Sequence, residues 1–511
     1  MRRFRPPNSR LYAALSGALL VLAAPPVDWF ILAWVGLTPL FIALEKPSRN
    51  GFGEGFTAGA VFNAGILYWL AFNTGTYPAV AALTMFSAAI ILATAWGVAA
   101  WVFVKMRQTL GALAWIFLPL SWCAWEGWLS HLGELAFPWP LLALTQNGCN
   151  PILQVMEFTG VWGVSFWVAA VNGSVYLILR NSSQNIKRGA IAALTILATI
   201  PFISEGLARR WDKGDPQPSI NIAVIQGNLD PLEKWTEGAE GSWAAYDSLT
   251  RLAAREGIQL AVWPETALPA HLRMQSLMSQ RLRELCREQG VYVLTGASDY
   301  ARLKGEARPL NSAFLMSPDR GLIDVYSKRH LVPFGERVPF QSICPSLGEL
   351  NFGQAEFLPG LRQTIFEVPV GTDTARFGAL ICFESAIPNL TRQAVKKGAN
   401  LLVTISNDAW YGRSSEPAQI SALSRFRCIE TRRAMARASN TGISFLADQR
   451  GRILEKTSIY VPAWRTAWLP LINRQTFYVR HGDIFLSIVT LIYGIGLIWT
   501  VFKLLKYPAE T

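Results

Sequence analysis

Long apolar stretches follow one another closely through the first 205 residues, and one more lies near the C-terminus. A helix needs about 20 apolar residues to cross the roughly 30 Å core of a bilayer. The pattern predicts eight spans, near residues 11–26, 28–45, 55–73, 79–104, 110–128, 161–179, 189–205 and 484–502. We therefore expect a multi-pass α-helical membrane domain over residues 1–205, and a last helix with a short tail over residues 483–511.

Basic residues gather in alternate loops between these predicted spans. Thirteen mark one side: Arg2, Arg3, Arg5, Arg10, Lys46, Arg49, Lys105, Arg107, Arg180, Lys187, Arg188, Lys503 and Lys506. Because basic residues in short loops stay on the cytoplasmic side, the pattern predicts that both termini are cytoplasmic and that residues 206–482 lie on the outer face. If the Arg-rich N-terminus were instead a cleaved signal peptide, the orientation of the rest would not change.

The stretch 129–160 is long for a connection and carries Pro138, Trp139 and Pro140. We expect it to lie along the membrane surface as an amphipathic segment. The predicted spans show no ladder of acidic and basic residues of the kind that marks ion or proton pathways. This pattern favours a membrane platform over a transporter.

From residue 219 the pattern changes to short β-rich runs separated by amphipathic stretches. Strands are predicted near residues 219–228, 258–265, 291–298, 311–317, 322–328, 364–370, 376–384, 400–407 and 442–448, and helices near 241–256, 277–289, 388–398 and 416–437. Apolar strands followed by helices are typical of a layered α/β domain. We expect this domain to occupy residues 206–482.

Composition and charge narrow the choice of partners. The 511 residues are 51% hydrophobic and 16% charged, which excludes a disordered chain. The net charge of +12 would by itself suit nucleic acid or an anionic membrane. Membrane topology accounts for the thirteen basic residues above, and residues 206–482 hold 34 basic against 26 acidic residues. We therefore predict a membrane protein that binds no nucleic acid.

The sequence lacks several common signatures of chemistry. Its six Cys form no CxxC pair, it has four His, and it has no GxxxxGK[ST], GxGxxG or GxSxG motif. We therefore predict neither a metal nor a cofactor.

Three predicted strand ends carry reactive side chains instead. Cys382 follows an apolar run, Glu265 follows Trp263 and Pro264, and Lys328 ends a third strand. Ends of strands are where α/β sheets place catalytic groups. A thiol needs a base to become a thiolate, and a cation lowers its pKa and stabilises an oxyanion. These residues are candidates for thiol catalysis; the alternative is a buried structural thiol and two paired surface charges.

The motifs WPET, YSKRHLVPFGE and ICFES, in this order, resemble the Glu-Lys-Cys signature of the nitrilase (carbon-nitrogen hydrolase) superfamily. Together with eight predicted spans, the whole chain resembles the apolipoprotein N-acyltransferase family, and SNDAWYG (406–412) with the Arg-rich stretch after it also matches. This resemblance implies a nitrilase-like α-β-β-α sandwich on an eight-helix membrane platform.

The resemblance also implies a role for each catalytic candidate. Cys382 would carry an acyl group, Glu265 would be the general base, and Lys328 would stabilise the oxyanion. Glu336 would be a second acid that orients Lys328 or shares protons with Glu265.

The resemblance extends to residues around these four. Phe383, which stands where many members carry Tyr, and Glu384 follow the nucleophile; a buried acceptor for loop amides is the other interpretation of Glu384. Trp235 and Trp410 would bind substrate near the mouth of the site, with core packing as the alternative. The Gly- and Pro-punctuated stretch 340–361, which carries Leu350, Phe352, Phe357 and Leu358, is predicted to be a lid or lipid-contacting arm, with an ordinary covered loop as the alternative.

The implied reaction is a ping-pong transfer in a bacterial inner membrane, with the catalytic domain in the periplasm. The donor would be a phospholipid, namely phosphatidylethanolamine, and the acceptor the N-terminal amine of a diacylglyceryl apolipoprotein. Two other hypotheses remain: a membrane-anchored amidase or nitrilase with the same three residues, and a transporter or receptor whose outer domain only binds a ligand. Whether Cys286, Cys344 and Cys428 form a disulfide stays open at this point.

Overall fold

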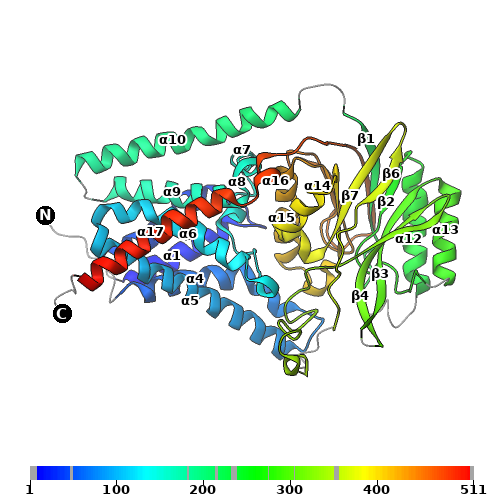
Figure 1. The fold of residues 1–511 in the computed structure, drawn as a ribbon, viewed down its shortest axis with the longest axis horizontal. Helices are drawn as coiled ribbons and strands as arrows, with labels where there is room; N and C mark the ends of the chain where they lie inside the picture. The colour runs from blue at the N-terminus through cyan, green and yellow to red at the C-terminus, as the bar shows by residue number, and fades with distance from the viewer. Residues whose placement is uncertain are drawn as a thin grey trace.

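The computed structural model describes residues 8–45, 50–180, 183–212, 217–231, 239–273, 276–303, 305–349 and 356–506. A bundle of helices lies on one side and a pair of β-sheets on the other (Figure 1). Of the basic residues used above to predict topology, Arg2, Arg3, Arg5, Lys46 and Arg49 lie outside the described residues.

Each predicted span falls on helical structure. The helices are α1 (Ser9–Ala23), η1 (Phe30–Leu32) with α2 (Ala33–Gly36) and α3 (Thr38–Glu45), α4 (Phe52–Leu67) with η2 (Tyr68–Phe72), α5 (Pro78–Leu110), η3 (Gly111–Leu113), α6 (Ala114–Ser130), α9 (Val161–Leu179), α10 (Gln184–Ala208) and α17 (Ile484–Lys506). Among the described residues, five helical runs are long and apolar enough to cross a membrane, and Ser9–Ala23 and Phe30–Glu45 are shorter apolar helices.

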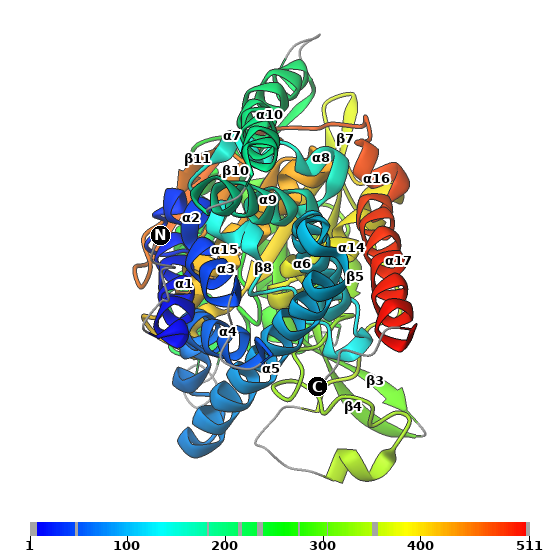
Figure 2. The ribbon, with the colours of Figure 1, turned by 90° about the vertical axis from the view of Figure 1, so that its left-hand side faces the viewer.

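The outer surface of the bundle is apolar. Phe86, Ile116, Phe202 and Ile498 are all more than half exposed, and helices α10 and α17 lie at its rim (Figure 2). An apolar outer surface around a packed interior is what a lipid environment requires. The start of α1 and the end of α17 lie at the same end of the bundle, away from the sheets (Figure 1).

The strands of the described residues form two six-stranded sheets. The first has the order β12-β1-β2-β3-β4-β5 and the second β11-β10-β9-β8-β7-β6. The strands are β1 (Ser219–Gln226), β2 (Leu260–Val262), β3 (Tyr292–Leu303), β4 (Glu306–Ser317), β5 (Gly321–Ser327), β6 (Phe366–Val370), β7 (Asp373–Ile381), β8 (Leu401–Ser406), β9 (Met435–Ser439), β10 (Phe445–Ala447), β11 (Ile453–Lys456) and β12 (Ala463–Pro470). β1, β2 and β3 run parallel, as do β7, β8 and β9.

The two sheets pack face to face through a shared apolar core. Ile222 and Val262 of the first sheet and Phe377 and Val403 of the second belong to one buried cluster. Helices α12 (Ala239–Ala254) and α13 (Leu277–Gln289) cover the outer face of the first sheet, and α14 (Pro388–Lys396) and α15 (Glu416–Thr431) cover that of the second (Figure 1). The α-β-β-α sandwich implied by the resemblance is confirmed.

One predicted helix was too long. The prediction ran through 416–437, but α15 ends at Thr431 and Met435–Ser439 forms β9. Arg432 turns the chain by adopting a left-handed conformation with φ of 51°, and its guanidinium donates to Glu157 Oε2 at 2.9 Å. This buried tertiary contact, which local pattern does not reveal, ends the helix.

The stretch 129–160 is partly buried within the protein, with exposed residues near its start at 131 and 133–135; its place along the membrane surface stays a prediction. It forms short helices, η4 (Gly133–Leu135), η5 (Leu142–Gln146), α7 (Asn150–Leu153) and α8 (Met156–Thr159), and all five residues of η5 are buried. Glu126 near the end of α6 accepts a hydrogen bond from Leu142 N at 2.8 Å. The segment is thus packed between the helical bundle and the sandwich.

Helix α15 joins the sandwich to the bundle through one buried amide. Gln419 Oε1 accepts hydrogen bonds from the indole N–H groups of Trp139 (2.6 Å) and Trp69 (3.2 Å). Its Nε2 donates to Ile66 O (3.2 Å) and Pro25 O (3.4 Å). Gln419 belongs to the sandwich and all four partners to the bundle, so this side chain holds the two parts together.

Replacing Gln419 tests this joint. Gln419→Leu leaves two buried indole N–H groups and two carbonyls without their partner, so we expect the free energy of unfolding to fall by about 2–4 kcal/mol. Thermal unfolding of the full-length protein in detergent measures the change. The matched control is Gln280→Leu at an exposed position of α13, which should alter stability by no more than about 0.5 kcal/mol. Equal melting temperatures for the two variants would contradict the proposed joint.

Candidate active site

The structure brings Glu265 and Lys328 together at the ends of their strands. Glu265 lies shortly after β2, and Lys328 directly follows β5. Lys328 Nζ lies 3.5 Å from Glu265 Oε1 and 2.8 Å from Glu336 Oε1. The Lys328 side chain is only 1% exposed, so its charge depends on these two carboxylates.

Cys382 comes directly after β7, the strand that pairs with β8, and begins the short helix η8 (Cys382–Ala386). The charges of Glu265 and Lys328 both act on its thiol. Its φ of 53° is left-handed, as is the φ of 46° at Thr266 beside Glu265. Such a conformation is costly for residues other than glycine and is frequent at functional sites. It turns the chain sharply at the thiol.

Two groups that the sequence did not reveal hold Glu265 in place. Asn311 Nδ2 on β4 donates to Glu265 Oε1 at 2.7 Å and lies 3.4 Å from Glu336 Oε1. The backbone N–H of Asn407 donates to Glu265 Oε2 at 2.9 Å. Both carboxylate oxygens are therefore fixed. An Asn inside a predicted strand carries no signal of such a role, and a backbone donor carries none at all.

Gly296 on β3 allows Glu265 to approach the sheet. A Cβ at this position would lie 2.4 Å from Thr266 N and 2.7 Å from Glu265 Cα. Both distances are shorter than atoms can tolerate, so only glycine fits. The close packing of Glu265 therefore requires a glycine on β3, a neighbouring strand that contributes none of the candidate catalytic side chains.

The electrostatics favour a neutral thiol beside a basic carboxylate. Burial raises the pKa of Glu265, and Glu336 raises it further, while Lys328, Asn311 and the Asn407 N–H oppose this. Burial, with a contribution from Glu265, raises the pKa of Cys382 well above that of a free thiol, although Lys328 opposes the shift. A carboxylate of increased basicity next to a protonated thiol is suited to general-base catalysis.

Lys328 remains charged despite its burial. Burial alone would lower the pKa of Lys328, but the carboxylates of Glu336 and Glu265 outweigh it and raise the pKa well above its ordinary value. Glu336 is itself held by Val332 N, which donates to its Oε2 at 2.9 Å. A fixed ammonium beside a nucleophile can stabilise negative charge that develops on a substrate oxygen.

Glu384 is a structural acceptor. It is fully buried, and its oxygens accept hydrogen bonds from Arg329 N (2.7 Å), Tyr326 OH (2.8 Å), Ile381 N (2.9 Å) and His330 N (3.1 Å). These bonds tie the chain after Lys328 to the turn that carries Cys382. The interpretation of Glu384 as an acceptor for loop amides agrees with this geometry.

Phe383 points toward the bundle. Its ring stacks on Phe137 (centroids 5.8 Å apart) and Trp139 (6.2 Å), and lies 5.7 Å from the ring of His330. Phe137 and Trp139 belong to the stretch between α6 and α9. The residue after the candidate nucleophile is thus packed by the helical part of the protein.

Of the two tryptophans predicted to bind substrate, the structure describes only Trp410. Trp410 lies in η9 (Asp408–Tyr411), and its carbonyl accepts from Thr74 N at 2.9 Å, so it faces the loop between η2 and α5. Trp235 lies outside the described residues, as do Leu350 and Phe352 of the predicted arm. In the described part of that arm, Phe340 and Ile343 are exposed.

Buried polar groups continue beyond Cys382. Asp408 receives two hydrogen bonds from Arg437, at 3.0 and 3.1 Å. Glu416 at the start of α15 is buried, and its Oε2 has no hydrogen-bond partner among the described residues. Burial raises the pKa of Glu416 well above its ordinary value, and Asp408 adds to this effect. The helix predicted over 416–437 gave no sign of a buried acid at its start, so the sequence did not reveal the environment of Glu416.

All six cysteines are free. Cys286 and Cys428 are buried and Cys344 is exposed. Cys286, Cys344 and Cys428 form no disulfide in this structure. Among the six cysteines, Cys382 is the one whose thiol is affected by the charges of both a Lys and a Glu.

Comparisons with known proteins cover nearly the whole chain. Residues 221–460 match the carbon-nitrogen hydrolase family, and residues 16–174 match the apolipoprotein N-acyltransferase N-terminal domain. The chain is 34% identical to the apolipoprotein N-acyltransferase of Geobacter metallireducens, over 94% of this chain and 93% of that protein. It is 31% identical to the one of Chlorobaculum tepidum, over 92% of each.

Among solved structures, an amidase from Nesterenkonia sp. with acrylamide added at its active-site cysteine matches with 18% identity and a TM-score of 0.39. The match covers 52% of this chain and 98% of the amidase.

The role of Asn311 is testable through the reactivity of Cys382. Asn311→Ala removes a donor that favours ionised Glu265, so the pKa of Glu265 should rise further. With ionised Glu265 as the predicted base for the thiol proton, the pH at which Cys382 reacts at half its maximal rate with a small alkylating reagent should increase by about one unit. The measurement uses a Cys344→Ser background, since Cys344 is exposed.

The control is Asn221→Ala, which removes another buried amide, one that donates to Glu256 O and Gly257 O. We expect no change in its pH profile. An unshifted profile for Asn311→Ala, or the same shift in both variants, would show that Asn311 does not set the basicity of Glu265.

Proposed function

Since the chain belongs to the apolipoprotein N-acyltransferase family, we propose that it transfers an acyl chain from a phospholipid to the N-terminal amine of a diacylglyceryl apolipoprotein. The enzyme is an acyltransferase with a carbon-nitrogen hydrolase domain. The observation that carries the proposal is the packing of Phe383, next to Cys382, on Phe137 and Trp139 of the membrane part.

In the first half-reaction, Glu265 takes the proton of the Cys382 thiol, and the thiolate attacks the ester carbonyl of the phospholipid. Lys328 and a backbone N–H next to Cys382 stabilise the oxyanion. The ester C–O bond then breaks, and Glu265 returns the proton to the leaving oxygen. The products are an acyl thioester on Cys382 and a lysophospholipid. We propose phosphatidylethanolamine as the donor and its sn-1 chain as the transferred group.

In the second half-reaction, the α-amine of the acceptor cysteine attacks the thioester carbonyl. Glu265 accepts the proton that the nitrogen loses. The C–S bond breaks, and the thiolate recovers that proton, which leaves an amide and the original thiol. Glu336 holds Lys328 in position through both steps, at 2.8 Å. Exclusion of water protects the thioester between the two steps.

The location we propose is the bacterial inner membrane, with the catalytic domain in the periplasm and both termini in the cytoplasm. The basic residues of alternate loops support this orientation, and so does the arrangement of α1 and α17, whose cytoplasmic ends lie together away from the sheets (Figure 1). The domains proposed are residues 1–205, 206–482 and 483–511.

Two other functions compete with this one. A membrane-anchored amidase would share Glu265, Lys328 and Cys382 but would need one helix as anchor, and it would have no reason to pack Phe383 against membrane segments. A transporter or receptor would have no use for a thiol placed beside a buried ammonium and a fixed carboxylate.

Labelled phospholipid distinguishes these functions. The purified full-length protein should acquire label that hydroxylamine removes, because a thioester is cleaved by this reagent, and a diacylglyceryl peptide with a free N-terminus should release the label as an amide. Cys382→Ala should acquire none. Glu265→Gln should slow labelling by about 10²-fold or more, and Lys328→Met by about 10²–10³-fold.

Cys344→Ser is the matched control and should label at the normal rate. Labelling of Cys382→Ala equal to that of the unaltered protein would refute the mechanism. Label that water removes as fast as the peptide does would favour the amidase, and no label at all would favour the transporter or receptor.

A further inference from the structure

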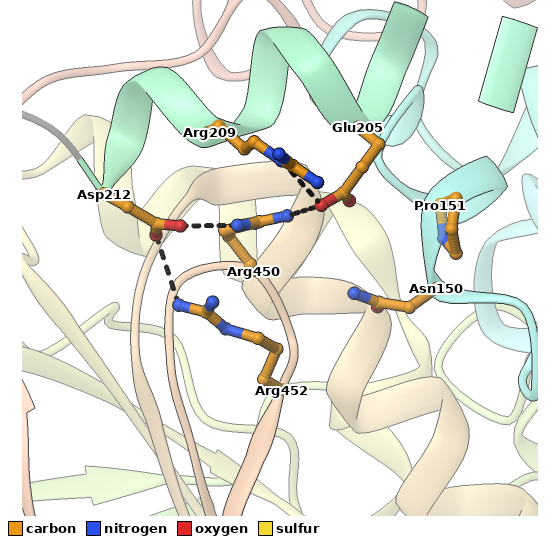
Figure 3. A pocket seen from close by; sticks show the side chains of 7 residues that line it. All are labelled: Asn150, Pro151, Glu205, Arg209, Asp212, Arg450 and Arg452. Carbon is orange, nitrogen blue, oxygen red and sulfur yellow. Dashed lines mark hydrogen bonds and ion pairs between the residues drawn. The ribbon is translucent and has the colours of Figure 1, made fainter. Parts of the chain in front are cut away.

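A charged pocket of about 510 Å³ lies at the outer end of α10, apart from the catalytic residues. Its walls come from three segments that are distant in the sequence: α7, the end of α10 with η6 (Arg209–Trp211), and the connection between β10 and β11. The lining residues are Asn150, Pro151, Glu205, Arg209, Asp212, Arg450 and Arg452 (Figure 3). Glu265, Lys328 and Cys382 are not among the lining residues, so this pocket is separate from the candidate active site.

Arg450 forms the fixed centre of the pocket. It is only 4% exposed, and it lies between Glu205 and Asp212, to which its two terminal nitrogens donate (Figure 3). Its Nε, which is also buried, has no hydrogen-bond partner among the described residues, and neither has Asn150 Oδ1. Buried polar atoms without partners are rare in folded proteins and call for a ligand or water.

Arg209 and Arg452 lie on either side of Arg450 (Figure 3). Arg209 Nε lies 3.5 Å from Glu205 and Arg452 NH2 lies 3.2 Å from Asp212. Asp448, outside the lining, also pairs with Arg452. The side chains of Arg209 and Arg452 are nevertheless 68% and 50% exposed. Each guanidinium has five N–H donors, so both can still bind an oxyanion.

With Asp448 counted, three carboxylates face the three arginines of the pocket, so the exposed N–H groups of Arg209 and Arg452, and not a net charge, are what suit a ligand with a single negative charge. The apolar side chains of Phe202, Ile203 and Leu207 on α10 are exposed directly before these charges begin. Along a helix that is apolar enough to cross a membrane, this change marks the level at which acyl chains give way to headgroups.

We propose that this pocket binds the phosphodiester of a phospholipid in the leaflet next to the catalytic domain, at a site separate from Cys382. Arg209 and Arg452 bind the phosphate oxygens, and the acyl chains lie along Phe202, Ile203 and Leu207. Glu205 and Asp212 disfavour headgroups with a second negative charge. The bound lipid would cover the contact between α10 and the β10–β11 connection.

Native mass spectrometry of full-length Cys382→Ala protein in detergent tests this site, because this background cannot form the acyl-enzyme. The probe is dioleoylphosphatidylcholine, titrated into delipidated protein. An arginine near a lipid surface contributes roughly a fivefold change in affinity, so Arg209→Gln and Arg452→Gln should each weaken one binding event about fivefold, and the double variant about 25-fold. Arg480→Gln, an exposed arginine on α16 (Phe477–His481), should leave it within about twofold.

Additional ligands in the same experiment distinguish binding of a lipid from binding of a free anion. Inorganic phosphate and glycerophosphocholine, which lack acyl chains, should bind at least about tenfold more weakly than the lipid, and Phe202→Gln should weaken lipid binding without affecting either of them. If the double variant binds as much lipid as Arg480→Gln does, the proposal is wrong. If phosphate binds as tightly as lipid, the pocket is a site for soluble anions. Arg452→Lys, which keeps the charge, provides a folded variant of intermediate affinity should the double variant melt early.

Discussion

Helix α15 packs against the sandwich on one side and against the helical bundle on the other. The arrangement of these two parts depends on the hydrogen bonds that its buried polar groups form. A surface helix would present charge to water, but here the polar groups of α15 are buried and need partners within the protein. Gln419 finds four of them in the helical bundle. At the other end, Glu430 accepts from Val161 N at 3.1 Å, and Arg432 pairs with Glu157. These contacts fix the distance and rotation between the sandwich and the bundle, because hydrogen bonds in a dry interior tolerate little displacement.

The cluster of Glu265, Lys328 and Glu336 shows how a buried charge can be stabilised. The Lys328 ammonium lies within 3.5 Å of an oxygen of each of two carboxylates, those of Glu265 and Glu336, and an amide and a backbone N–H donate hydrogen bonds to Glu265. Removal of the ammonium would leave two buried carboxylates without a cation, and removal of either carboxylate would leave Lys328 with a single partner. The same arrangement leaves the thiol neutral at rest while a base and a cation stand beside it, which is the state that a nucleophile needs before its substrate arrives.

The sequence was sufficient to predict the candidate side chains that lie at the ends of strands. Glu265, Lys328 and Cys382 each follow an apolar run, and such runs identify strands and their ends. Asn311 and Gln419 could not be found in this way, because each occupies an unremarkable position within a strand or a helix, and its importance comes from partners distant in the sequence. The burial of η5 within the stretch 129–160 was missed for a related reason: the Trp and Pro residues of this stretch suit a membrane surface as well as a buried contact. Phe383 was assigned to the site, but its neighbours Phe137 and Trp139 depend on a docking geometry that no local pattern encodes.

The stacking of Phe383 on Phe137 and Trp139 also shows which parts of the chain surround the thiol. The turn that carries Cys382 packs on rings that lie about 240 residues earlier in the chain, in the stretch between α6 and α9. A sandwich separated from the bundle would lack these ring contacts next to Cys382. The surroundings of the thiol are therefore shared between the two parts of the protein, and neither part completes them alone.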